Sequence, residues 1–197
     1  MTGSSSRDLA LVCSFAGLTA LLGLLPALPV AWSPVPVTPQ SLGPMLAGSL
    51  LGWRRALASQ TIFWLLVALG LPLLSGGRGG LGVLLGPSVD FLLGYVLCAG
   101  AIGWACQRWH TERALPLLLV NLLGGVLLLD LLGALGFAAV LRTGPVASLV
   151  MAATYVPGGL LKAALATSVA VGVHRAVPGL LPAPVPAATV RLAGEAR

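Results

Sequence analysis

The chain has 197 residues, of which 57% are hydrophobic and only 8% are charged, and its mean hydropathy is +1.00. A soluble domain carries about a quarter charged residues, so this sequence cannot cover a water-facing surface, and we expect an integral membrane protein. The formal net charge is +6, but the arginines stand at segment ends and form no basic patch interleaved with aromatic residues, so nucleic acid is not expected as a partner.

The first hydrophobic segment runs from Leu9 to Val30 and follows Arg7. It is longer than the apolar part of a signal peptide, so we expect a retained helix. Residues Trp32–Gln40 contain several prolines, which forbid a regular helix and predict an extended connector. The apolar segment Ser41–Gly52 is shorter than the roughly 20 residues of an upright span, and we expect a tilted or partial helix there.

The remaining hydrophobic segments complete a predicted bundle of six helices, within a single membrane domain of residues 1–177. They are Ala56–Leu74, Ser88–Cys106, Ala114–Leu141 and Val146–Val173, the last interrupted at Pro157-Gly158-Gly159. Between two of them, Ser75–Gly86 is a glycine-rich loop, which must be buried in protein or line a wet cavity if it lies at membrane depth. The tail, residues 178–197, is rich in proline and alanine and is expected to be disordered and cytoplasmic.

The basic side chains predict the orientation of this bundle. With both termini in the cytoplasm, only two arginines, Arg78 and Arg142, fall outside, and eight fall inside: Arg7, Arg54, Arg55, Arg108, Arg113, Arg175, Arg191 and Arg197. This asymmetry follows the positive-inside rule. It places the proline-rich connector and the glycine-rich loop together at the outer face, so a site built from them would open outward.

Lys162 is the only lysine, and it lies in the sixth predicted span, one turn after Pro157-Gly158-Gly159. A charged side chain inside the bilayer costs a few kcal/mol or more unless it meets a partner or a wet cavity. One role open to Lys162 is to bind the carboxylate of a ligand. The other is to reach an interface or to pair with Asp130 or Asp90.

Other polar residues in the spans have similar pairs of roles. Asp90 follows Ser88 at the start of the fourth span, where the two side chains can receive a ligand or satisfy the first turn of the helix. Asn121 and Asp130 lie deep in the fifth span, and for both a hydrogen bond between helices is the favoured role.

The outward connectors carry further candidates. Arg78 in the glycine-rich loop can clamp an anion or seal the loop by donating to backbone carbonyls. Gln40, Trp32 and Tyr155 flank these connectors and are either ligand contacts or, for the aromatic residues, interfacial anchors. His110 and His174 fall at cytoplasmic ends, where we expect both to be solvated.

In the first helix, Ala16 and Ala20 stand four residues apart with Gly17 between them. Such a small-residue face permits close helix approach, either within the bundle or against another membrane subunit. The sequence contains no phosphate-binding GxxxxGK[ST] motif, no HExxH or GxSxG motif, and no Cys/His metal cluster. We therefore expect no catalysis, no ATP hydrolysis and no bound cofactor or metal.

Four stretches together resemble the BioY family, the biotin-binding S components of energy-coupling factor (ECF) transporters, over roughly residues 9 to 175. V-P-V-T-P-Q-S-L-G at Val35–Gly43 is similar to the family signature. Gly70-Leu71-Pro72 precedes a glycine-rich segment, Gly76–Ser88, that ends in Gly-Pro-Ser as in the family. Y-V-P-G-G-L-L-K at Tyr155–Lys162 resembles the family motif Pro-Gly-Asp-x-x-Lys.

The resemblance implies a six-helix bundle that captures biotin from outside. Lys162 corresponds to the motif lysine and would neutralise the carboxylate, while Tyr155 and Trp32 pack the apolar middle of the ligand and Gly158 and Gly159 lie beside it. Gly159 stands where the family usually has Asp. The ureido ring is therefore left to Asp90, to Asn121 or to backbone groups.

The resemblance also implies partners and a location. The partners are a transmembrane coupling protein, which Ala16 and Ala20 would face, and two ATP-hydrolysing subunits, although some family members act without them. The location is the cytoplasmic (inner) membrane of a bacterium, with several spans and both termini inside. Alternatives are an S component for another carboxylated vitamin, a membrane enzyme acting on lipids, and a structural membrane subunit without a ligand.

Overall fold

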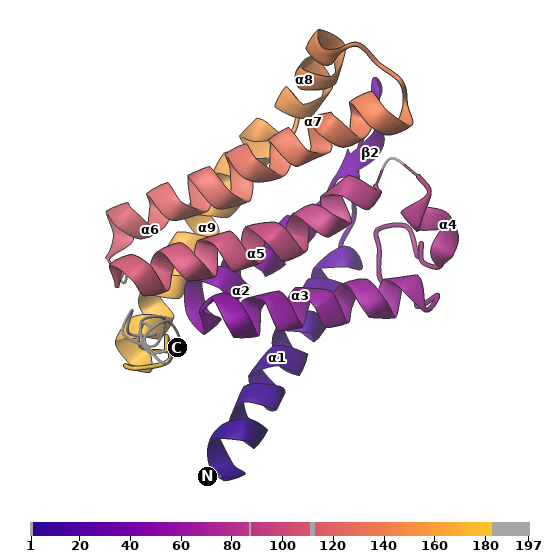
Figure 1. Ribbon diagram of the computed structural model, residues 1–197. Helices are drawn as coiled ribbons and strands as arrows, with labels where there is room; N and C mark the ends of the chain where they lie inside the picture. The colour runs from indigo at the N-terminus through magenta and orange to yellow at the C-terminus, as the bar shows by residue number, and fades with distance from the viewer. Residues whose placement is uncertain (1, 87, 111–112, 183–197) are drawn as a thin grey trace, which may run out of the picture.

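The computed structural model describes residues 2–86, 88–110 and 113–182 and forms a helical bundle with a small β-hairpin at one end (Figure 1). The elements in chain order are α1 (Thr2–Gly23), β1 (Leu28–Val30), β2 (Ser33–Val37), the 3-10 helix η1 (Pro39–Ser41), α2 (Leu42–Leu51), α3 (Trp53–Ala68), α4 (Leu81–Leu84), α5 (Val89–Trp109), α6 (Ala114–Asn121), the π-helical stretch η2 (Leu122–Leu127), α7 (Leu128–Val140), α8 (Pro145–Ala153) and α9 (Val156–Ala176).

The predicted class, a helical bundle of membrane-spanning segments, is confirmed. Within the described residues, four helices are long and apolar enough to cross a membrane: Ser6–Gly23, Val89–Trp109, Ala114–Val140 and Val156–Ala176. The third of these is continuous through α6, η2 and α7. Helices α2 and α3 occupy the two other predicted segments and are shorter than a full span. The first helix ends at Gly23 rather than Val30, because the chain beyond it enters strand β1.

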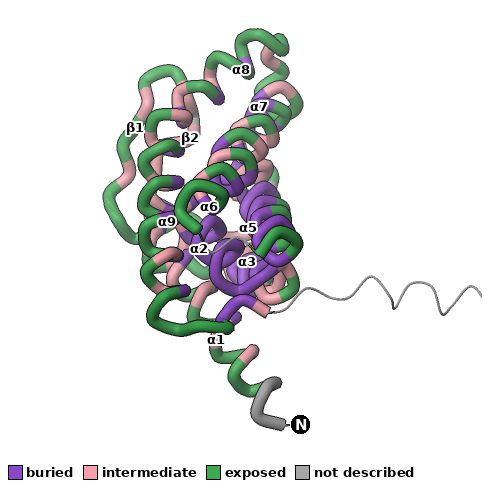
Figure 2. Tube along the Cα trace, turned by 90° about the vertical axis from the view of Figure 1, so that its left-hand side faces the viewer, coloured by how far each residue is buried: buried purple, intermediate pink, exposed green. Residues whose placement is uncertain are grey.

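Helix α2 forms the centre of the bundle. Every residue from Gly43 to Leu51 is buried, and Figure 2 shows buried backbone concentrated in α2, α3 and α5. The helix can therefore be short, since protein rather than lipid surrounds it. Its neighbour α5 approaches the α2–α3 junction so closely that a Cβ at Gly103 would lie 2.6 Å from the backbone N of Trp53 and 2.7 Å from the carbonyl C of Gly52.

Buried polar side chains join the helices at the bundle centre. The Asn121 amide is fully buried and donates to Ser49 Oγ (3.0 Å) on α2, to Thr167 Oγ1 (3.4 Å) on α9 and to Leu117 O (3.1 Å). His174, predicted to be solvated, is instead 5% exposed, and its Nε2 lies 2.9 Å from Ser49 O. The prediction was wrong because the last turns of α9 pack on α2.

The last predicted span is two helices, and the break falls at Thr154 and Tyr155 rather than at Pro157-Gly158-Gly159. Pro157 lies in the first turn of α9. A missing N–H costs nothing there, because the first turn has no intrahelical acceptor for it. Lys162 therefore lies in the second turn of α9, near the end of the bundle that carries the hairpin, and not in the middle of a span.

The opposite end of the bundle holds the start of α1, the end of α9 and the segment Val177–Pro182 (Figure 1). Leu180 and Leu181 are both buried. Arg55 Nη1 donates to Leu180 O (3.5 Å), and Gln107 Nε2 donates to Pro182 O (3.1 Å). The first part of the predicted disordered tail is therefore packed on the bundle, and residues 183–197 lie outside the described part of the chain.

Candidate functional site

A cavity lies at the hairpin end of the bundle, where segments far apart in the sequence meet. The hairpin strand β2 and η1, the loop after α3, the start of α5, the η2–α7 helix and the start of α9 all contribute to its wall. Its volume is about 660 Å³ including the mouth.

The cavity gathers most, but not all, of the predicted site residues. Those that line it are Gln40, Arg78, Ser88, Tyr155, Gly159 and Lys162, and those that do not are Asp90, Asn121, Gly158 and Trp32. Two lining residues of note, Asp130 and Tyr95, were not predicted as ligand contacts. Part of the sequence-derived set therefore lines this cavity, and the rest lies outside it.

Lys162 reaches from α9 to the chain around η1. Its Nζ donates to Thr38 O (3.1 Å) and to Ser41 Oγ (2.6 Å). Among the described residues it forms no ion pair with a carboxylate. An ammonium group has three donors, so one remains for a ligand. The two protein contacts hold the charge in place at the cavity wall.

Within the part of the chain that the structure describes, Asp130 is the only acidic side chain that lines the cavity. It is half-buried on α7, and its Oδ2 is buried without a hydrogen-bond partner among the described residues. The favoured prediction for Asp130, a hydrogen bond between helices, therefore has no counterpart among these residues. With Arg78 and Lys162 on the same wall, the cavity carries one more positive than negative side chain, which suits a ligand with a carboxylate.

Tyr155 links the hairpin to an aromatic wall. Its ring centroid lies 5.3 Å from that of Phe91 and 6.4 Å from that of Phe137. Its hydroxyl donates to Val35 O, and because it has a single proton the neighbouring Ser33 hydroxyl donates to it. The same side chain thus forms an apolar surface of the cavity and ties strand β2 to the start of α9.

Arg78 and Gln40 hold the loops around the cavity. Arg78 Nε donates to Ser75 O (3.1 Å), within the loop that follows α3, while the residue also lines the cavity. Gln40 is buried and its Nε2 donates to Leu73 O (2.9 Å) and Thr19 O (3.3 Å). Both residues therefore have a structural role that leaves part of each side chain at the cavity.

The predicted residues outside the cavity have other neighbours. Asp90 faces α7, where a Cβ at Gly136 would lie 2.1 Å from its Oδ2. Gly158 packs beneath the hairpin, since a Cβ there would lie 3.3 Å from Val37 Cγ1. Trp32 is 66% exposed, and its Nε1 donates to Thr154 Oγ1 (3.0 Å).

The small-residue face of α1 is used inside the bundle. Ala16 is buried and Ala20 packs on the same cluster of α3 and α5 side chains. The face that α1 leaves exposed carries Leu9, Cys13, Gly17 and Leu21 instead. A partner that docks on α1 in this conformation would therefore meet these residues rather than Ala16 and Ala20.

Removing the Tyr155 hydroxyl is expected to loosen the hairpin and leave the bundle folded. In Tyr155→Phe, the ring keeps its contacts with Phe91 and Phe137, but Val35 O and the Ser33 hydroxyl lose their partner. Each lost hydrogen bond is worth about 1 kcal/mol. Amide hydrogen exchange in residues 28–37 should accelerate about fivefold if one bond limits opening and about thirtyfold if both do, with exchange in α5 unchanged. Unchanged exchange in the hairpin would contradict the anchoring role.

Comparison with known proteins shows the same architecture elsewhere. A solved structure described as the S-component for biotin from an ECF-type ABC transporter superposes with a TM-score of 0.85, is 28% identical in sequence, and the match covers 89% of this chain and 94% of that one.

Sequence relatives cover nearly the whole chain. The probable biotin transporter BioY of Bacillus subtilis is 40% identical over 86% of this chain and 91% of its own length. The biotin transporter BioY of Rhizobium etli is 39% identical over 91% of this chain and 98% of its own length. The model of the BioY family matches residues 1–179. The chain belongs to the BioY family.

Proposed function

We propose that this protein binds biotin from the outer face of the membrane, as the substrate-specific S component of an ECF-type transporter. The observation that carries the proposal is the Lys162 ammonium at the wall of a cavity of about 660 Å³, held by Thr38 and Ser41 and without a carboxylate partner among the described residues. The choice of biotin is supported by two sequence relatives that are named as biotin transporters. It is also supported by a solved structure with the same fold that is described as an S-component for biotin.

The chemistry of biotin fits this cavity. A carboxylate pairs with Lys162, and burial away from water strengthens the pair because the local dielectric constant is low. The aliphatic chain and the bicyclic ring lie against apolar side chains such as Phe91, Leu92, Leu129 and Tyr155. A few placed polar groups in an apolar wall give both affinity and selectivity.

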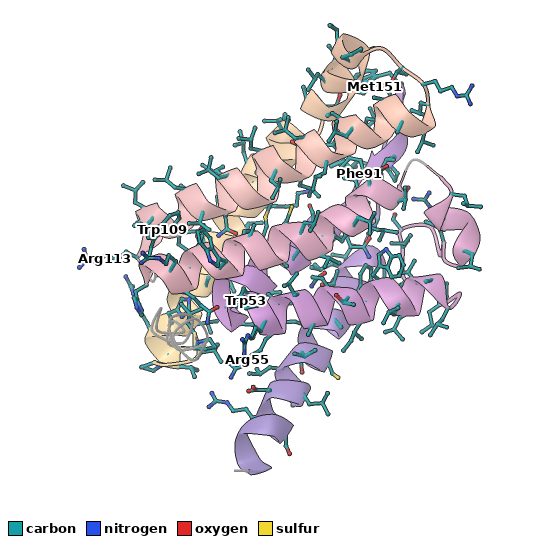
Figure 3. All side chains as sticks on the ribbon, viewed as in Figure 1. Trp53, Arg55, Phe91, Trp109, Arg113 and Met151 are labelled. Atoms are coloured by element: carbon teal, nitrogen blue, oxygen red, sulfur yellow. The ribbon has the colours of Figure 1, made fainter. Side chains whose placement is uncertain are left out.

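The orientation follows from the two ends of the bundle. Figure 3 places Trp53, Arg55, Trp109 and Arg113 toward the end where α1 starts and α9 ends, and Phe91 toward the other end. Tryptophan is typical of both membrane interfaces, and arginine is in excess at the cytoplasmic one. This supports a multi-pass protein of the bacterial cytoplasmic membrane with both termini inside and the cavity facing outward.

The proposed role requires partners that supply energy. This chain has no phosphate-binding loop of the GxxxxGK[ST] type, so uptake would depend on a transmembrane coupling protein and two subunits that hydrolyse ATP. The chain itself is a binding protein and not an enzyme in this proposal. The exposed face of α1, with Cys13, Gly17 and Leu21, is the surface through which we expect it to contact the coupling protein.

The test is equilibrium binding of radiolabelled biotin to the purified chain in lipid nanodiscs, with other carboxylated vitamins as competitors. We expect saturable binding that excess unlabelled biotin abolishes and lipoate, nicotinate and pantothenate do not. Displacement by one of these vitamins at lower concentration than biotin would move the assignment to an S component for that vitamin. A folded sample with no saturable binding of any of them would favour a structural subunit and contradict the proposal.

A further inference from the structure

Among the described residues Asp130 has no hydrogen-bonded or ion-paired protein partner at membrane depth, although Lys162 is near enough to interact with it electrostatically. Its Oδ2 is buried and makes no hydrogen bond, and among the described residues Asp130 forms no ion pair. Asn121, on the same continuous helix, by contrast bonds to Ser49 on α2 and to Thr167 on α9. An acidic group inside a span is rare and marks a functional site unless it is paired. Because Asp130 lines the cavity, its missing partner can come from a ligand.

The position of Asp130 relative to Lys162 follows from contacts between two antiparallel helices. Helix α9 runs against the α6–η2–α7 helix, and two pairs fix the alignment: Thr167 opposite Asn121, and Gly159 opposite Val126, where a Cβ would lie 2.9 Å from Val126 Cγ1. The Tyr155 and Phe137 rings, whose centroids are 6.4 Å apart, continue the alignment toward the hairpin.

Asp130 and Lys162 therefore lie on opposite sides of the contact between Gly159 and Val126. Asp130 is one turn beyond Val126 toward the hairpin, and Lys162 is about one turn beyond Gly159 in the other direction. At 1.5 Å of rise per residue, their Cα atoms are about 10 Å apart along the helix axes. Gly159 lines the cavity together with both charged residues.

We infer that Asp130 accepts one ureido N–H group of biotin, while Lys162 binds the carboxylate at the other end of the extended ligand. This inference rests on the proposed function. The two N–H groups of a five-membered cyclic urea point outward on opposite sides of the carbonyl, so a single carboxylate binds one of them. The pairing also supplies the missing partner for Asp130 Oδ2.

Two substitutions of Asp130 and three ligands test this assignment. Asp130→Asn keeps the shape but replaces one acceptor oxygen with a donor, and we expect it to weaken biotin binding about tenfold to a hundredfold, the range for hydrogen bonds to a charged group. Biotin amide, which lacks the carboxylate, should suffer the same relative loss. The cyclic guanidinium of 2-iminobiotin is positively charged at neutral pH. Asp130→Asn should therefore reduce the affinity for 2-iminobiotin more than the affinity for biotin, because the attraction to a negative charge is lost as well.

Asp130→Leu tests whether a loss of biotin binding is caused by a loss of folding stability. Since the wild-type carboxylate has no hydrogen-bonded protein partner among the described residues, its removal should leave the thermal unfolding temperature equal or higher while biotin binding falls at least as far as in Asp130→Asn. Asp90→Asn is the matched control, because Asp90 is also an acid in a membrane helix with a buried, unpaired Oδ2 but does not line the cavity. Its biotin affinity should stay within about twofold of wild type.

Three results would overturn the inference. The first is a biotin affinity equal to that of wild type in either Asp130 variant. The second is an equal loss of affinity for biotin and for 2-iminobiotin in Asp130→Asn. The third is an unfolding temperature of Asp130→Leu that is low enough to account for its loss of binding. Failure of the proposed function is a separate result, because the wild-type protein itself would then show no saturable biotin binding.

Discussion

Replacing Lys162 with alanine is expected to weaken biotin binding about a hundredfold or more. The substitution removes the positive charge that pairs with the ligand carboxylate, and leaving a buried charge without its partner costs about 3–5 kcal/mol. Equilibrium titration of the variant with radiolabelled biotin in nanodiscs measures the effect. The variant should remain folded, because Thr38 O and the Ser41 hydroxyl lose one donor at a cavity wall that water can reach.

A ligand without the carboxylate provides the control for charge. Biotin amide should bind to wild type and to Lys162→Ala with similar affinity, so the preference of wild type for biotin over its amide should disappear. Arg142→Ala removes another basic residue, one that is exposed and does not line the cavity, and should bind biotin normally. Normal biotin affinity in Lys162→Ala would place the carboxylate elsewhere, with Arg78 as the next cation on the cavity wall.

Adding one methyl group at Gly103 is expected to destabilise the whole bundle. In Gly103→Ala the new Cβ would lie 2.6 Å from Trp53 N and 2.7 Å from Gly52 C. These are backbone atoms, which cannot rotate away, so α5 must separate from the α2–α3 junction. Overpacking of this kind costs about 1–3 kcal/mol, and we expect the upper end of that range. Denaturant-induced or thermal unfolding in detergent measures the loss.

Gly172→Ala is the matched control for this experiment. Gly172 lies within α9, and a Cβ there meets no atom within 4 Å. Alanine has a higher helix propensity than glycine by about 1 kcal/mol, so this variant should be as stable as wild type or slightly more stable. Equal stability of the two variants would show that the close approach at Gly103 is not important for the fold.

The sequence predicted the membrane segments well and the breaks between them less well. Apolar runs correctly located the helices, because a bilayer demands continuous hydrophobic length. The break in the last segment was misplaced by a few residues, since Pro157 and two glycines are signals of both helix interruption and helix start. The chemical pattern alone does not separate these cases, and only the packing of α8 against α7 decides that the turn comes first.

The sequence indicated the residue types and the region of the candidate site, but not which side chains point into the cavity. Asp90 lies in the first turn of α5 and Asp130 lies deep in the α6–η2–α7 helix, and two roles were open for each of them. Which of them reaches the cavity depends on how each helix is rotated about its axis. That rotation is set by close contacts such as Gly136 against Asp90 and Gly159 against Val126, which involve residues distant in the sequence.

The packed segment Val177–Pro182 has a consequence for how the protein is made. Membrane helices enter the bilayer in the order in which the ribosome makes them. The hydrogen bonds from Arg55 to Leu180 O and from Gln107 to Pro182 O therefore form only after the last helix has been synthesised. A product of premature termination after α9 would contain every helix of the described residues and the complete cavity, yet would expose the end of the bundle where α1 starts and α9 ends. Proteases that survey membrane proteins could recognise such a chain as incomplete.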